Sequence, residues 1–175
     1  MPFAEGNVVT TPKFVLFLIG FGSLSAVLVS DEAHFIFALD HANLLFHEAG
    51  HLLYGLLGPS AGLYSGTLGQ LTIPVICGVA FVRQKSWVSL SVVMLWFFEN
   101  LFNIAPYVAD ARSQRLPLLG GGEHDWTNIL SRWGALQYDA TISATLIAIG
   151  WLGLLATLVW TAFLWWQCRT LYEEY

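Results

Sequence analysis

The sequence predicts an all-α, polytopic membrane protein of about five transmembrane helices, with a short interfacial helix in the loop before the last span. Hydrophobic residues make up 56% of the chain and charged residues only 11%, whereas about a quarter of a soluble domain is charged. The aromatic share of 15% suits apolar outer surfaces with aromatic belts at two membrane interfaces. A soluble chain of 175 residues could not enclose so much apolar material in a core. No internal repeat or low-complexity segment divides the chain, so residues 1–175 are expected to form a single integral membrane domain.

Five apolar runs set the predicted spans, because roughly 20 helical residues cross a bilayer. They lie at 14–30, 35–57, 67–83, 87–110 and 141–166. The third run contains Pro74 and several glycines, which predicts a kinked span or a re-entrant hairpin. With this order, the ends of the second and fourth helices and the loop after the fourth lie on one side of the membrane.

The long connection at 111–139 carries the interfacial helix. Its second half, "TNILSRWGALQY", follows a glycine-rich stretch, and the apolar residues in and just before it recur at helical spacing beside polar ones. They are Trp126, Ile129, Leu130 and Trp133. This pattern predicts an amphipathic helix that lies on the membrane surface.

Charge and cysteine content exclude two classes of partner or bond. The formal net charge of −5 provides no basic patch, so nucleic acid is not an expected partner. Cys77 and Cys168 both lie in apolar runs and are interpreted as small core residues rather than a disulfide. The expected protein is multi-pass, surrounded by membrane lipid, and assigned to a bacterial inner membrane.

The chemistry concentrates in "FHEAGHLLYG", residues 46–55. His47, Glu48 and His51 form the pattern H-E-x-x-H, in which two histidines four residues apart share a helix face and can bind one ion. Glu48 is rotated by about 100° from His47, which suits a general base acting on zinc-bound water rather than a ligand. A hydrogen-bonded polar cluster without metal is the alternative, but charged groups in mid-bilayer cost roughly 2.5–3.5 kcal/mol each on insertion scales. One Zn²⁺ per chain is therefore the prediction.

Two polar residues precede the motif on the same helix face. Asp40 and Asn43 lie seven and four residues before His47, so either could hydrogen-bond the second ring nitrogen of a histidine ligand. Capping of the helix near the membrane surface is the alternative for Asp40.

A third ligand must come from elsewhere in the chain. The fourth run places Asn100, Asn103 and Asp110 on one polar stripe, and Asp110 is the first choice. The loop offers His124 or Asp125 as alternatives, where glycines would let the backbone fold back over the site. The structural alternative for Asp110 is a salt bridge. The structural alternative for Asp125 is the N-cap of a helix. The amides of Asn100 and Asn103 are better suited to hydrogen-bonding a ligand side chain or orienting a substrate backbone than to binding zinc.

Together, these features resemble the site-2 protease family of intramembrane zinc metallopeptidases. The resemblance rests on "HEAGH" in an early apolar helix, the following "GPSAGLYSGTLGQLTIP", and a later helix with asparagine and aspartate. It implies zinc binding by His47, His51 and a distant aspartate, with Glu48 as general base. The family's Asn-Pro and Asp-Gly pairs are more widely spaced here, in "NIAPYVAD", and Ala111 replaces the glycine. The chain would be a minimal member, without a PDZ or other regulatory domain.

The leading hypothesis is therefore a membrane-embedded zinc metallopeptidase of the HExxH type that cleaves transmembrane or membrane-adjacent protein segments. The alternative is a non-proteolytic accessory subunit that keeps a peptidase-like fold, with other subunits of a membrane complex as partners. A third hypothesis is an ion or proton carrier, because ionisable residues within membrane helices mark such paths; the residues are Asp40, His41, Glu48, Glu99 and Asp110. The sequence does not show the paired repeats of many transporters.

Overall fold

The computed structural model describes residues 8–30, 36–118 and 123–173. All regular structure in these three segments is helical, which confirms the all-α prediction for them. The helices are α1 (Thr11–Ser30), α2 (Phe37–Gly55), α3 (Pro59–Gly62), α4 (Ser65–Arg83), α5 (Trp87–Ala109), α6 (Asp125–Arg132), the 3₁₀ helix η2 (Leu136–Tyr138) and α7 (Asp139–Glu173).

Four helical segments are long and apolar enough to cross a membrane. They are α1, α4, α5, and the segment Leu136–Thr170 that joins η2 to α7. The second apolar run forms α2, a helix of 19 residues that is not among the four. Its histidines, Asp40 and Glu48 lower its hydropathy. The molecule therefore has the helices of a membrane protein, with four spans defined by length and composition.

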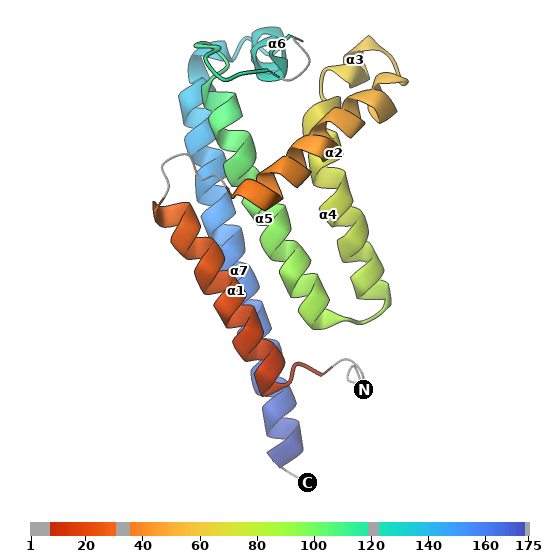
Figure 1. Cartoon of the computed structure of the whole chain (residues 1–175), viewed down its shortest axis with the longest axis vertical. Helices are drawn as coiled ribbons and strands as arrows, with labels where there is room; N and C mark the ends of the chain where they lie inside the picture. The colour runs from red at the N-terminus through yellow and green to blue at the C-terminus, as the bar shows by residue number, and fades with distance from the viewer. Residues whose placement is uncertain (1–7, 31–35, 119–122, 174–175) are drawn as a thin grey trace.

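The long helices run roughly parallel, and α2 crosses them obliquely (Figure 1). Helix α5 makes its most extensive contact with α7, and α2 makes its own with α4. Helices α3 and α6 and the C-terminal end of α5 gather at one end of the molecule, while the C-terminus of α7 lies at the other. Segments far apart in the sequence thus meet at the end near α6.

Small residues allow α7 to lie close against α5. A Cβ at Gly150 would overlap the ring of Phe102, and one at Gly153 would overlap the ring of Phe98. Each phenylalanine of α5 therefore occupies the space that a larger side chain on α7 would take, as is common between membrane helices. Helix α5, held against α7 by this contact, also packs against α4 and α2.

A second pair of glycines brings α2 onto α4. A Cβ at Gly50 would collide with the backbone of Ser65 and Gly69, so the two helices touch through their main chains. Because Gly50 lies between His47 and His51 in sequence, this close approach sets the motif against the first turn of α4.

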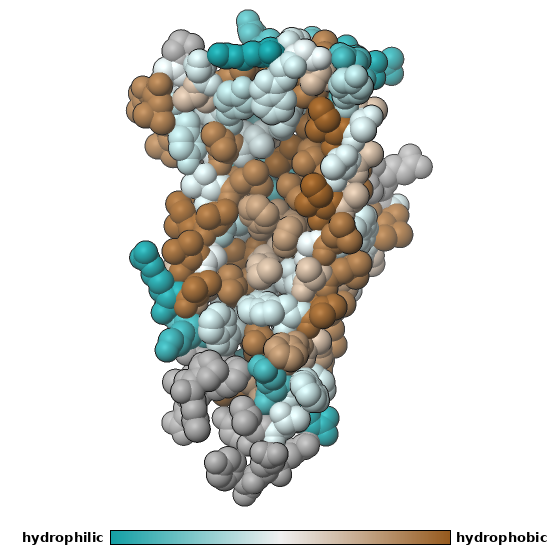
Figure 2. All heavy atoms as spheres, turned by 180° about the vertical axis from the view of Figure 1, so that it is seen from behind, coloured by the Kyte–Doolittle hydropathy of each residue, from teal (hydrophilic) through white to brown (hydrophobic). Residues whose placement is uncertain are grey.

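Apolar side chains cover much of the surface. Leu16, Val29, Leu52 and Val159 are each more than 65% exposed. Figure 2 shows apolar residues along the middle of one face and polar residues gathered at the end that holds α6. A surface of this kind is stable in lipid, whereas soluble monomers rarely expose so large an apolar area.

The predicted helix of the long loop forms as α6. Ile129 and Leu130 are buried against the bundle, and Trp133 is exposed at the C-cap. His124 caps the N-terminus, since its Nδ1 accepts a hydrogen bond from the Thr127 N–H at 3.2 Å. The glycines at 120–122, expected to let this loop fold back, lie outside the described residues.

Candidate metal centre

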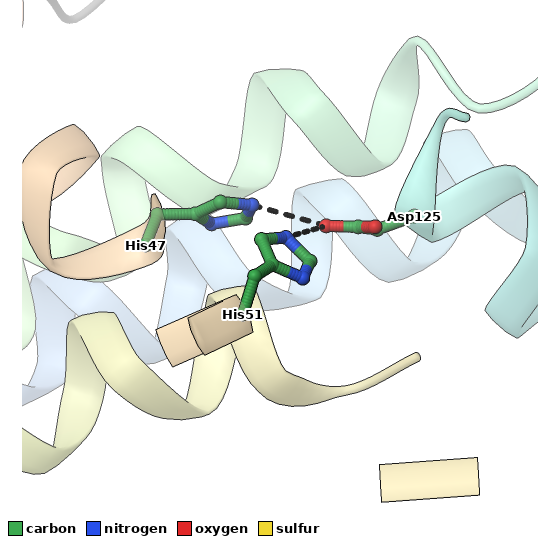
Figure 3. A group of neighbouring side chains, drawn as sticks. All are labelled: His47, His51 and Asp125. Carbon is green, nitrogen blue, oxygen red and sulfur yellow. Dashed lines mark hydrogen bonds and ion pairs between the residues drawn. The ribbon is translucent and has the colours of Figure 1, made fainter. Parts of the chain in front are cut away.

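The two motif histidines meet one carboxylate. His47 and His51 project from adjacent turns of α2, and their ring centroids are 5.0 Å apart. Asp125, the first residue of α6, places its Oδ2 at 3.0 Å from His47 Nε2 and at 3.1 Å from His51 Nε2 (Figure 3). One ligand atom from each residue lies within 4.8 Å of the other two. Two imidazoles and a carboxylate therefore converge on one point.

The hydrogen bonds of Ser65 favour one tautomer of His51. Ser65 Oγ donates its single proton to the carbonyl of Gly62 at 2.5 Å, so at its 2.9 Å contact with His51 Nδ1 it must accept. In the neutral tautomer that fits this pattern, the proton of His51 is on Nδ1 and Nε2 presents a lone pair to the Asp125 oxygen. Two acceptors 3.1 Å apart repel each other unless a proton or a cation lies between them.

A glycine makes room for the other histidine. A Cβ at Gly66 would overlap the imidazole of His47, so the ring lies directly over the first turn of α4. The same ring forms a T-shaped pair with the ring of Tyr107 on α5, with 5.9 Å between ring centroids. His47 is buried, while Asp125 and His51 are partly exposed, which leaves the group open on one side.

These donors fit a zinc ion. Zinc sites of hydrolases use three protein ligands of the nitrogen and carboxylate type and keep a fourth position open. A tetrahedral ion with bonds of about 2.0–2.1 Å would separate its ligand atoms by about 3.3 Å, close to the 3.0 and 3.1 Å that separate Asp125 Oδ2 from the two histidine nitrogens. The hydrogen bond from Ser65 supplies the partner that a histidine ligand needs at its second nitrogen.

Asp110, the first choice for third ligand, is engaged elsewhere. It is the C-cap of α5, and its carboxylate accepts hydrogen bonds from Ser113 Oγ at 2.5 Å and from the backbone N–H groups of Arg115 and Leu116, each at 2.9 Å. Burial acts to raise the pKa of Asp110, but these hydrogen bonds hold it below its ordinary value. The structure thus brings Asp125, and not Asp110, to the two histidines.

The other alternative, His124, lies beside Asp110. Its Nε2 is 3.5 Å from Asp110 Oδ2, and its ring contacts that of Tyr107 at a tilt of 36°, with 4.3 Å between centroids. Its Nδ1 serves as the cap of α6. His124 therefore holds the start of α6 in place, next to the aspartate that reaches the histidines.

The polar residues of α2 and α5 bond to one another. Asn103 Nδ2 donates to Asp40 Oδ1 at 2.7 Å, and Asn43 Nδ2 donates to Glu99 Oε2 at 3.0 Å. Asn100 donates to the backbone of its own helix, at the carbonyl of Trp96. The expected contacts from Asp40 and Asn43 to a motif histidine are replaced by this network, and Ser65 takes that position at His51.

Glu48 lies on the open side of the group. Its side chain is exposed, and it is close enough to the Tyr107 hydroxyl to interact with it electrostatically, as Asp125 also does. The rotation of Glu48 away from the histidine face, expected from helix geometry, thus leaves it beside the site rather than among the ligands.

Sequence patterns did not indicate Ser65, Gly66 or Tyr107. Serine and glycine at the start of a helix are common, and a tyrosine near the end of an apolar helix is typical of a membrane interface. Glu99 did carry a sequence signal, because an acid inside an apolar run needs a partner, and it entered the ion-carrier hypothesis on that ground.

The role of Ser65 can be tested through zinc affinity. If this group holds a zinc ion, Ser65→Ala should still bind about one zinc per chain, but about 10–100-fold more weakly, because His51 loses the acceptor at its second ring nitrogen. Competition with a chromophoric chelator measures the affinity. The control is Ser131→Ala, a serine exposed on α6, and an unchanged affinity in Ser65→Ala would contradict the assignment.

Comparison with known proteins yields no relative: no family model, no curated protein and no solved structure matches this chain.

Proposed function

We propose that this chain is a membrane-embedded metallopeptidase that holds one Zn²⁺ between His47, His51 and Asp125. The observation that carries the proposal is the convergence of His47 Nε2 and His51 Nε2 on one Asp125 oxygen, at 3.0 and 3.1 Å. In the neutral tautomer of His51 that fits the contacts of Ser65, Nε2 faces this oxygen with a lone pair, and a cation between the two atoms would remove their repulsion. The H-E-x-x-H pattern and its likeness to the site-2 protease family support the same reading.

Zinc, when bound, polarises a peptide carbonyl as a Lewis acid and acidifies water. The chain's own contribution is the carboxylate of Glu48. It takes a proton from the water as the water oxygen bonds to the carbonyl carbon, and it gives that proton to the leaving amine as the C–N bond breaks. The exposure of Glu48 leaves room for a peptide on its side of the site.

The proposed arrangement in the membrane has five spans. The four apolar segments would be joined by α2 as an oblique fifth crossing, and α6 would lie at the interface. A site formed by α2 and α6 is then near one membrane surface, where water and an unwound substrate segment can both reach it. Leu52, Leu53 and Leu56, each at least 65% exposed, continue from His51 as an apolar face suited to hydrophobic substrate segments.

The test is metal-dependent hydrolysis by the purified protein in detergent. We expect cleavage of fluorescently labelled casein and of a labelled transmembrane peptide. Dialysis against 1,10-phenanthroline should abolish it, and about one equivalent of Zn²⁺ should restore it. Zinc binding without any cleavage would instead favour the hypothesis of an accessory subunit. Cleavage that survives removal of the metal would refute the proposal.

A further inference from the structure

Tyr107 lies at the edge of the candidate metal centre, in the last turn of α5. Its hydroxyl oxygen accepts a hydrogen bond from the backbone N–H of Asp125 at 3.1 Å. Its ring is held between two imidazoles, with centroids 5.9 Å from that of His47 and 4.3 Å from that of His124. The phenol is therefore fixed by contacts on three sides, next to the group formed by His47, His51 and Asp125.

The proton of this hydroxyl is available for a ligand. A tyrosine hydroxyl has one proton to donate, and here its oxygen accepts from Asp125 while no residue in the described segments accepts from it. The phenol is neutral near pH 7, so it remains a donor. Tyr107 is only partly buried, and a molecule entering the open side of the site can reach it.

We infer that Tyr107 donates this proton in a hydrogen bond to the oxygen that becomes negative when a peptide carbonyl is attacked, which makes it a substrate-binding residue for a tetrahedral oxyanion. The inference rests on the proposed function and deepens it. A fixed donor at the place where charge develops stabilises the transition state more than the substrate. The Asp125 N–H contributes by holding the phenol oxygen, so little reorganisation is needed when the oxyanion forms.

The experiment separates metal binding from oxyanion binding. The protein is loaded with Co²⁺, whose visible spectrum reports both metal occupancy and ligand binding. It is then titrated with a dipeptide phosphonate in which a tetrahedral phosphonate replaces the scissile carbonyl. Wild type is compared with Tyr107→Phe, which keeps the ring contacts, and with Tyr138→Phe, whose exposed side chain lies in η2.

Tyr107→Phe should bind cobalt as wild type does and bind the phosphonate about 10–100-fold more weakly. For casein hydrolysis, kcat should fall about 10²–10³-fold, the range for losing one oxyanion donor, with KM little changed. Equal phosphonate affinity in the two proteins would overturn the inference. A parallel loss of cobalt affinity would also overturn it, because the hydroxyl would then act only as a support for Asp125. Wild type that takes up no cobalt would overturn the proposed function, and this inference with it.

Discussion

Replacing Asp125 by alanine should leave the detergent-purified protein without zinc, while Asp110→Asn should retain about one zinc per chain. Asp125 Oδ2 is the only carboxylate oxygen in the described residues that groups with the two motif histidines. Losing a direct ligand should weaken zinc binding by more than the 10–100-fold that is typical when a residue hydrogen-bonded to a ligand is lost. Elemental analysis of the two variants beside wild type makes the measurement.

His47→Ala removes one of the proposed ligands on α2 and, like Asp125→Ala, should leave the purified protein without zinc. Because Asp110 caps α5 and binds the chain that follows it, the Asp110→Asn protein should melt at a lower temperature even though it keeps its metal. Loss of zinc in Asp110→Asn, with zinc kept in Asp125→Ala, would show that the sequence preference for Asp110 is correct and the observed geometry misleading.

The competition between Asp110 and Asp125 shows how far sequence reasoning reaches. Asp110 lies at the end of an apolar helix, and Asp125 lies near the start of a polar one. Both are acids, and spacing along the chain cannot distinguish them. What separates them is the fold of the loop: residues 113–116 turn back so that their donors meet Asp110. The backbone donors belong to every residue type, so no side-chain pattern reports them.

The helices were more accessible to prediction than the site. Apolar runs correctly indicated α1, α4, α5 and α7, because a span must satisfy its backbone internally and present apolar side chains to lipid. Helix α2 is the intermediate case, since its run is helical as expected but contains the polar face that makes the site. The oblique path of α2 depends on main-chain contact at Gly50 and Gly69, which is a property of two helices together.

The same limit explains the polar residues inside the bundle. A stripe of Asn100, Asn103 and Asp110 was visible in the sequence, but each residue has a different use. Asn103 joins Asp40 across the helix interface, Asn100 bonds its own helix, and Asp110 ends it. Helical periodicity shows that side chains share a face, but their partners are set by which helix lies opposite.

Glu48→Gln should keep its zinc and lose hydrolysis by about 10²–10⁴-fold, the contribution of a positioned general base. Glutamine has the same shape as glutamate but cannot take the proton of the attacking water. The side chain is exposed, so the free energy of unfolding should change by no more than about 0.5 kcal/mol. Initial rates of casein cleavage, measured on preparations of equal zinc content, provide the comparison.

Glu123→Gln is the matched control, because Glu123 is also an exposed acid near the same end of the molecule, and its carboxylate accepts a hydrogen bond from Asn128 Nδ2 at 2.8 Å. It should cleave at the wild-type rate. If Glu48→Gln is as active as this control, Glu48 is not the base and the attacking water must lose its proton elsewhere. If neither wild type nor control cleaves any substrate while both hold zinc, the metal is structural and the chain acts as a subunit of a larger membrane complex. The exposure of Glu48 favours the first expectation, since a base must be reachable from the side on which a peptide enters.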